Sequence, residues 1–119
     1  MKKRQDLRAR IQEYAWRIVR RYVALPERTE AQVLGKQLLR SGTSVGAHAR
    51  EACRARFNPD FSNKIEGALQ ELEESAYWLE LLADAGVLAA TRLEPQLQET
   101  NELTAIFVTM ARNTKSKGS

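Results

Sequence analysis

The feature that most constrains this chain is the helical spacing of its apolar residues, which is interrupted only where proline or glycine occurs. Within residues 6–24 the apolar positions recur at the intervals that place them on one face of an α-helix. No segment shows the sustained alternation of apolar and polar residues that is typical of a half-buried strand. The sequence therefore predicts an all-α fold. The apolar face of this first segment consists of Leu7, Ile11, Tyr14, Ala15, Ile18, Tyr22 and Leu25.

Proline and glycine divide the chain into four predicted helices. Pro26 ends the first, Asn58-Pro59 begins the third, and Gly86 ends the third, since proline suits a helix start and glycine a helix end. Because the connections are only a few residues long, neighbouring helices must run antiparallel. The sequence predicts one domain over residues 1–119, an up-down-up-down antiparallel four-helix bundle. The predicted helices are 6–24, 30–56, 59–85 and 91–112, followed by a polar tail at 113–119.

Side chains that can cap a helix occur near all four predicted helix starts, and Asn58 is the predicted N-cap of the third helix. Asp6 is the predicted N-cap of the first helix. Thr29 with Gln32, and Thr91 with Glu94, match the capping box of the second and fourth helices. We expect these side chains to bind the backbone N–H groups that have no partner inside the helix.

The second predicted helix contains a run of small residues at 41–46, with the sequence SGTSVG. Each glycine costs about 1 kcal/mol relative to alanine in a helix interior. Either the helix kinks here, or the small residues let a neighbouring helix approach closely. The predicted core faces of the later helices are Leu34, Leu38, Ser41, Val45, Ala49 and Ala52, then Phe61, Ile65, Ala68, Leu69, Leu72, Ala76, Leu79 and Ala83, then Leu93, Leu97, Thr100, Thr104, Phe107 and Ala111.

The same run, as GTSVG at 42–46, matches the Gly-x-Ser-x-Gly motif of α/β-hydrolases. That motif needs a preceding strand and a later Asp and His to activate the serine. Here the preceding segment is predicted helical, and the only histidine, His48, is four residues after Ser44. One histidine and one cysteine, Cys53, also cannot form a zinc site or an internal disulfide. The sequence predicts no enzyme, no metal site and no cofactor.

Composition indicates a globular protein, because 43% of the residues are apolar and 29% are charged. The N-terminal residues are heavily charged and lack the apolar stretch of a signal peptide. No run approaches the roughly 20 apolar residues that are needed to span a bilayer. We therefore expect a cytoplasmic protein.

Positive charge is concentrated in the first half of the chain. Residues 1–56 hold 14 Lys or Arg against 5 Asp or Glu, whereas residues 57–119 hold 5 against 10. Basic residues opposite the core face of the second helix, with a flanking stripe on the first, form either an ordinary solvated surface or a surface that contacts nucleic-acid phosphates. The candidate nucleic-acid-binding residues are Arg10, Arg17, Arg21, Lys36, Arg40, Arg50 and Arg54.

Apolar residues also lie away from the core faces of the first and third helices. Both helices are therefore apolar on more than one side, which in a lone bundle would leave aromatic residues exposed. We expect these positions to form a subunit interface. The candidate interface residues are Trp16, Val19, Val23, Tyr77, Trp78 and Leu81.

Residues 33–47 (VLGKQLLRSGTSVGA), 50–52 (REA), 54–56 (RAR) and 77–82 (YWLELL) resemble a bacterial family. It is the four-helix-bundle family named for proteins encoded in intervening sequences of large-subunit ribosomal RNA genes. The resemblance runs from about Leu7 to Arg112 and implies a homopentameric ring. The family is similar to the accessory variability protein of diversity-generating retroelements, so the resemblance implies RNA or a ribonucleoprotein as partner and no catalysis. His48 and Cys53 depart from the residues expected in the family.

These observations predict a non-catalytic, oligomeric helical scaffold that binds RNA or DNA phosphates through basic helix faces. It could serve a reverse transcriptase or another RNA-handling complex as an accessory subunit. The alternative is a protein-binding scaffold whose basic faces pair with acidic faces of neighbouring subunits. The two hypotheses share a fold and differ in which groups neutralise the arginines.

Overall fold

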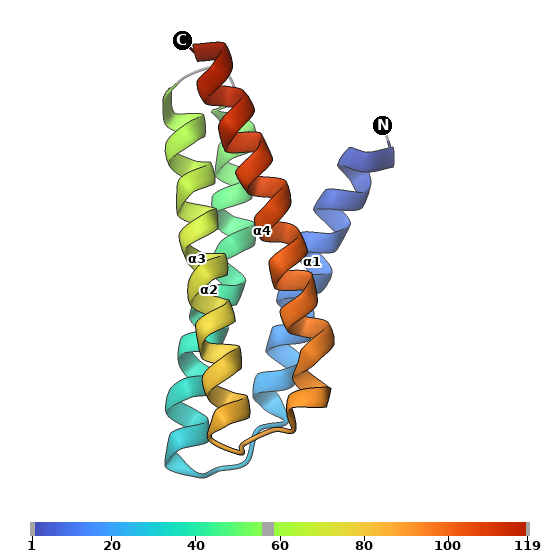
Figure 1. Cartoon of the computed structure of the whole chain (residues 1–119), viewed down its shortest axis with the longest axis vertical. Coiled ribbons are helices and arrows are strands. Elements are labelled where there is room, and N and C mark those ends of the chain that lie inside the picture. Colours follow the sequence, from blue (N-terminus) through green and yellow to red (C-terminus); the bar gives the residue numbers. More distant parts are fainter. Residues whose placement is uncertain (1, 56–58, 119) are drawn as a thin grey trace.

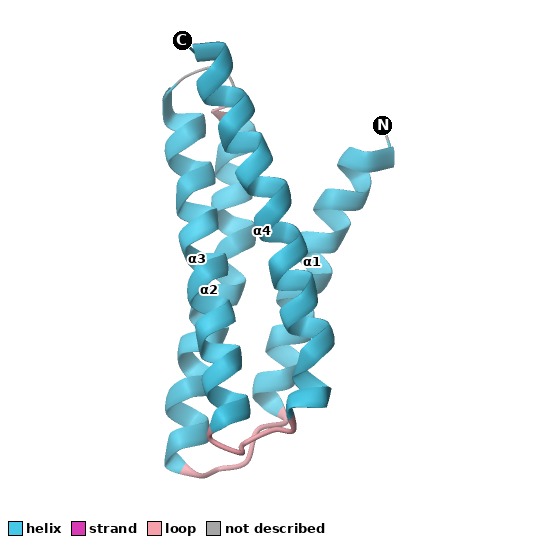
Figure 2. Ribbon diagram, viewed as in Figure 1, coloured by secondary structure: helices cyan, strands magenta, loops and turns pink. Residues whose placement is uncertain are grey.

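A computed structural model describes the backbone of residues 2–55 and 59–118, and the side chains of residues 7–55 and 60–113. The described backbone forms four α-helices and contains no strand (Figures 1 and 2). The all-α prediction is therefore confirmed for this part of the chain. The helices are α1, Lys2–Val23; α2, Thr29–Arg54; α3, Pro59–Asp84; and α4, Ala90–Gly118.

The helices differ in how closely they pack against one another. α2 and α3 lie together along most of their length, α4 packs mainly on α3, and α1 packs mainly on α2. α1 meets α4 over a smaller area, and Figure 1 shows its N-terminal half diverging from the other helices. The α1–α2 and α3–α4 loops lie at the same end of the molecule (Figure 1).

Glycine residues explain how α1 packs on α2. A Cβ atom added at Gly42 would clash with Ile18, and one added at Gly35 would clash with Leu25. One added at Gly46 would lie only 3.3 Å from Cγ2 of Ile11. Of the two alternatives left open by the run of small residues, the structure shows the close approach, in an α2 that continues through Gly42 and Gly46.

Four hydroxyl groups, one from each helix, lie inside the apolar core. The hydroxyl oxygens of Tyr14 and Thr100 share a hydrogen bond of 2.7 Å, and those of Ser41 and Ser75 share one of 2.8 Å. All four residues are buried. Burial raises the pKa of the Tyr14 hydroxyl, while hydrogen bonds with Thr100 and Ser75 act in the opposite direction. The Tyr14–Thr100 hydrogen bond connects α1 to α4, and the Ser41–Ser75 hydrogen bond connects α2 to α3, within the core.

The helix ends confirm some of the predicted signals. Gly86 has a φ of 73°, its N–H donates to the Ala83 carbonyl, and the Val87 N–H donates to the Leu82 carbonyl. This is the Schellman arrangement that ends a helix at glycine. Pro59 is the first residue of α3, as predicted, whereas Asn58 lies outside the described residues.

Three of the four predicted N-terminal caps are wrong. α1 begins at Lys2, so Asp6 lies inside the helix, because the preceding Lys and Arg residues are good helix formers. α2 has Arg28 as its N-cap, with no side-chain cap hydrogen bond. Gln32 instead donates to the Pro26 carbonyl and accepts from the Tyr22 hydroxyl, which fixes the α1–α2 loop. Thr91 lies inside α4, which begins at Ala90.

The predicted tail is also wrong in part. Residues 113–118 continue α4 as far as Gly118, because no proline or glycine interrupts the chain between the buried Ala111 and that point. At the other helix ends the observed bounds differ from the predicted ones by at most two residues, apart from the earlier start of α1.

Candidate nucleic-acid interface

Three cationic side chains lie on the outward side of α2. Lys36, Arg50 and Arg54 are exposed, and their spacing places them opposite the buried Leu38 and Val45 of the same helix. Among the side chains that the structure describes, none of these three cations takes part in an ion pair. Over 18 residues they span about 27 Å, at 1.5 Å of rise per residue. We call these three residues the α2 cationic face.

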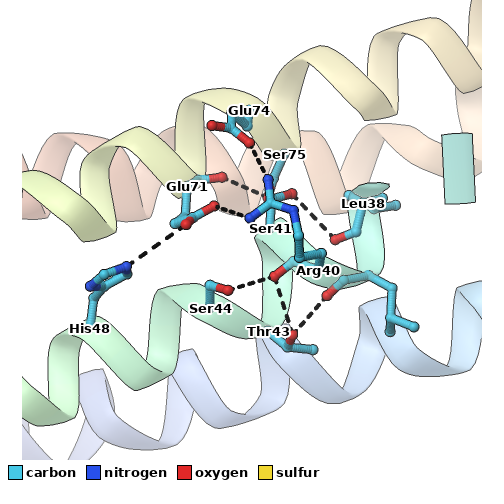
Figure 3. Close-up of polar contacts among 10 residues, drawn as sticks. Leu38, Arg40, Ser41, Thr43, Ser44, His48, Glu71, Glu74 and Ser75 are labelled. Atoms are coloured by element: carbon cyan, nitrogen blue, oxygen red, sulfur yellow. Dashed lines mark hydrogen bonds and ion pairs between the residues drawn. The ribbon is translucent and has the colours of Figure 1, made fainter. Parts of the chain in front are cut away.

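Arg40, the fourth predicted cation of α2, is already paired within the chain. Its Nη1 is 3.5 Å from Oε1 of Glu71, and its Nη2 is 2.5 Å from Oε1 of Glu74. Figure 3 shows the guanidinium between these two α3 carboxylates. The Arg40 side chain is 53% exposed, whereas that of Glu71 is only 15% exposed. The structure therefore places Arg40 at the α2–α3 seam with its charge neutralised.

Arg10 is paired in the same way with α4. Its guanidinium donates to both carboxylate oxygens of Glu99, at 2.7 and 3.0 Å, and to Glu102 at 2.9 Å. The hydrogen bonds with Glu99 raise the pKa of Arg10, and the charge of Glu102 adds to this effect. Arg10 therefore belongs to the α1–α4 seam and does not join the α2 cationic face.

The other predicted arginines of α1 have their partners on α1 and α4. Arg21 donates to the backbone carbonyl of Arg92 on α4 at 3.2 Å, and Arg17 pairs with Glu13 one turn earlier at 3.2 Å. Sequence reasoning missed Arg20, which stacks over the Trp16 ring at 5.9 Å and pairs with Glu13 at 3.6 Å. The spacing of four residues between Trp16 and Arg20 could have predicted this contact, because residues four apart are neighbours on a helix surface.

The candidate interface residues divide into exposed and half-buried groups. Trp16, Val23 and Tyr77 are 50%, 77% and 54% exposed. Val19, Trp78 and Leu81 are half-buried. The Trp78 indole packs against the core and meets the Tyr77 ring edge-on, with centroids 4.9 Å apart. Two exposed apolar residues, Val33 and Val108, were not predicted. The exposed members leave apolar surface available on both α1 and α3.

The sequence model of the family described as 23S rRNA-intervening sequence protein matches residues 4–109. The chain belongs to this family. A protein with unknown function from the S23 ribosomal protein family, from Bacteroides thetaiotaomicron, is 36% identical to it. That crystal structure aligns with a TM-score of 0.81 over 87% of this chain and 96% of its own. None of the curated proteins compared with this chain matches it.

In this member of the 23S rRNA-intervening sequence protein family, the Gly-x-Ser-x-Gly residues lie inside α2. The Ser44 hydroxyl donates to the Arg40 carbonyl at 2.7 Å, and His48 approaches Glu71, with 3.8 Å between its Nε2 and a carboxylate oxygen. The Ser44 hydroxyl is therefore hydrogen-bonded to the backbone of its own helix, and the His48 ring faces Glu71 of α3. Among the described residues no three His, Cys, Asp or Glu side chains are grouped to hold a metal ion. No described helix is long and apolar enough to cross a membrane.

Proposed function

We propose that this member of the 23S rRNA-intervening sequence protein family is a non-catalytic scaffold that binds RNA or DNA through the phosphate backbone. In this proposal the helices form an up-down-up-down bundle, and the bundles assemble into a homopentameric ring in the cytoplasm, without a cofactor. The ring serves a reverse transcriptase or another RNA-handling complex as an accessory subunit.

The observation that carries the proposal is the α2 cationic face. Lys36, Arg50 and Arg54 are exposed and make no ion pair with the described side chains. Unpaired cations on one rigid helix face can each displace a counterion from a phosphate, which is the main source of affinity that does not depend on sequence. No aromatic residue lies among them on that face, so the proposal predicts backbone contact with little base recognition.

Self-association strengthens such a surface. Exposed Trp16 on α1 and Tyr77 on α3 are the kind of aromatic residues that anchor subunit interfaces, and exposed Val23 extends the apolar surface of α1. A ring repeats the α2 cationic face once in each subunit, so that one long nucleic acid can contact several faces at the same time. A weak contact in one subunit then becomes a useful contact in the assembly.

The test is the salt dependence of RNA binding. Binding of labelled single-stranded and duplex RNA is measured by fluorescence anisotropy between about 50 and 200 mM salt. R50E/R54E should weaken binding to all sequences alike and flatten the slope of log K against log salt by about 1.4 for single strands or about 1.8 for duplex, since each phosphate contributes about 0.7 or 0.9.

The matched control is R28E/R92E, which reverses two exposed arginines at the starts of α2 and α4. Light scattering must show that both variants assemble as the unmodified protein does. Absence of binding by the unmodified protein at about 50 mM salt would exclude the proposal. An equal loss of affinity in R28E/R92E would show that binding does not depend on the α2 cationic face in particular.

One observation favours the alternative, a protein-binding scaffold. Arg10 and Arg40 are both neutralised by carboxylates of a neighbouring helix within the chain. The same chemistry could pair the α2 cationic face with the acidic, exposed Glu73 and Glu80 of α3 in an adjacent subunit. In that case R50E/R54E would break the oligomer.

A further inference from the structure

The two paired arginines share one arrangement. Arg40 of α2 lies between Glu71 and Glu74 of α3, and Arg10 of α1 lies between Glu99 and Glu102 of α4. In both cases the two carboxylates are three residues apart, so they occupy the same face of their helix one turn apart. Each cluster holds one guanidinium and two carboxylates, and its net charge is negative when all three groups are ionised.

The cluster on Arg40 lies next to the α2 cationic face. Arg40 follows Lys36 by four residues, which places the two side chains on neighbouring turns of the same helix. Without its partners Arg40 would therefore be a fourth cation beside Lys36, Arg50 and Arg54. Its side chain is half exposed, so solvent and large anions can reach it, but Glu71 and Glu74 each accept a hydrogen bond from one of its N–H groups and neutralise its charge.

The two carboxylates differ in how easily they can be displaced. The Glu71 side chain is 15% exposed and also has His48 nearby at 3.8 Å, whereas Glu74 is 47% exposed. A carboxylate that is mostly buried loses much of its hydration, so it is costly to leave it without its cationic partner. A phosphate that approaches Arg40 must therefore compete with Glu74 and Glu71 for the guanidinium, while both negative charges repel it.

We infer that Glu71 and Glu74 form an autoinhibitory contact, in which they occupy Arg40 and so restrict phosphate binding to the α2 cationic face. This inference rests on the proposed function. The ligand it concerns is the polyanionic backbone of RNA or DNA. Neutralising the two carboxylates converts a three-cation face into a four-cation face.

The experiment compares variants that change the charge equally. E71Q/E74Q removes both carboxylates from Arg40. E73Q/E80Q is the matched control, because it neutralises two exposed glutamates of the same helix that form no ion pair with any described residue. R40M is made in the unmodified protein and in E71Q/E74Q. Binding of labelled single-stranded RNA is measured from about 50 to 200 mM salt.

E71Q/E74Q should steepen the slope of log K against log salt by about 0.7, which corresponds to one added phosphate contact on a single strand. At about 50 mM salt its affinity should exceed that of E73Q/E80Q by about 1.4- to fivefold, the range expected for an exposed ion pair such as Arg40–Glu74. Adding R40M to E71Q/E74Q should abolish this excess, and R40M alone should change the affinity little.

Equal effects of E71Q/E74Q and E73Q/E80Q, or a gain that persists with R40M, would overturn the inference. Both results require an unmodified protein that binds RNA, so they are distinguishable from failure of the proposed function, in which the unmodified protein does not bind. Circular dichroism must show that each variant is folded. If E71Q/E74Q does not fold, E74Q alone carries the test, since Glu74 is about half exposed and its removal should still raise the affinity through Arg40.

Discussion

Replacing Gly42 with alanine tests the packing of α1 on α2, because two opposing effects can be estimated from the structure. Alanine in place of glycine inside a helix stabilises by about 1 kcal/mol. The new Cβ, however, would clash with Cδ1 of Ile18 and lie 3.2 and 3.3 Å from its two Cγ atoms. Rotation about χ2 moves only Cδ1, and Ile18 is fully buried. Overpacking of this kind costs about 1–3 kcal/mol, so G42A should destabilise by about 0–2 kcal/mol.

Gly46 provides the matched control on the same helix. A Cβ there meets only Cγ2 of Ile11, at 3.3 Å, and Ile11 keeps some access to solvent. G46A should therefore be neutral or stabilising by up to about 1 kcal/mol. The two variants receive the same gain in helix propensity, so G42A should be less stable than G46A, by up to about 3 kcal/mol, and this difference isolates the close contact of Gly42 with Ile18.

Urea unfolding followed by far-ultraviolet circular dichroism measures these differences, at one fixed protein concentration because assembly makes stability concentration-dependent. Adding I18V, which removes Cδ1, should make G42A less costly, with a favourable coupling of at least about 0.5 kcal/mol. The reasoning would be refuted by a G42A variant as stable as G46A, or by additive effects of I18V and G42A.

Three further predictions use other contacts. Y14F should destabilise by about 0.5–1.5 kcal/mol, since it removes the hydrogen bond with Thr100. Burial raises the pKa of Tyr14 above 10.0, so as pH rises the tyrosine ionises in the unfolded chain before it ionises in the folded protein, and the unmodified protein should lose stability above about pH 10. Unfolding measured at several pH values should show that Y14F lacks this loss of stability. The same loss in Y14F would contradict its assignment to Tyr14. W16A should weaken assembly, and light scattering that shows the unmodified chain as a monomer of 13.5 kDa would contradict an interface there. S44A should change stability by less than about 0.5 kcal/mol and leave all activity unchanged, so a loss of hydrolytic turnover would count against a non-catalytic protein.

Many core positions were predictable because they depend on local periodicity, although the fully buried Leu82 and Leu103 were not among the predicted core residues. Ser41 and Thr100 were placed on core faces by spacing alone, and both are fully buried. Their polarity gave no indication of partners, since Thr100 bonds a tyrosine 86 residues away and Ser41 a serine 34 residues away. The end of α3 at Gly86 was predictable for a similar reason, because it depends on one local residue, a glycine that adopts a positive φ without strain.

The capping boxes failed because a local pattern competed with a tertiary contact. The Gln32 side chain forms its hydrogen bonds with the Pro26 carbonyl and the Tyr22 hydroxyl. The conformation of the α1–α2 loop places these groups beside Gln32, so its partners depend on that loop and not on the local sequence pattern. The pairing of Arg40 was hidden for a related reason. Its partner Glu71 is 31 residues away, and the register of α3 against α2 determines which carboxylates face it. Sequence spacing placed Arg40 correctly on its helix but could not show that its charge was neutralised.

Lysine footprinting tests the central claim, binding of the nucleic-acid backbone by the α2 cationic face, most directly. The assembled protein is acetylated with and without single-stranded RNA at about 50 mM salt, and modification is quantified by mass spectrometry. Lys64 is the internal control, since it lies on α3 in an ion pair with Glu51. The account predicts that RNA lowers the reactivity of Lys36 and leaves that of Lys64 unchanged. Unchanged reactivity of Lys36 with RNA bound would contradict it, as would a Lys36 already protected by assembly without RNA, which would place the α2 cationic face in a subunit interface.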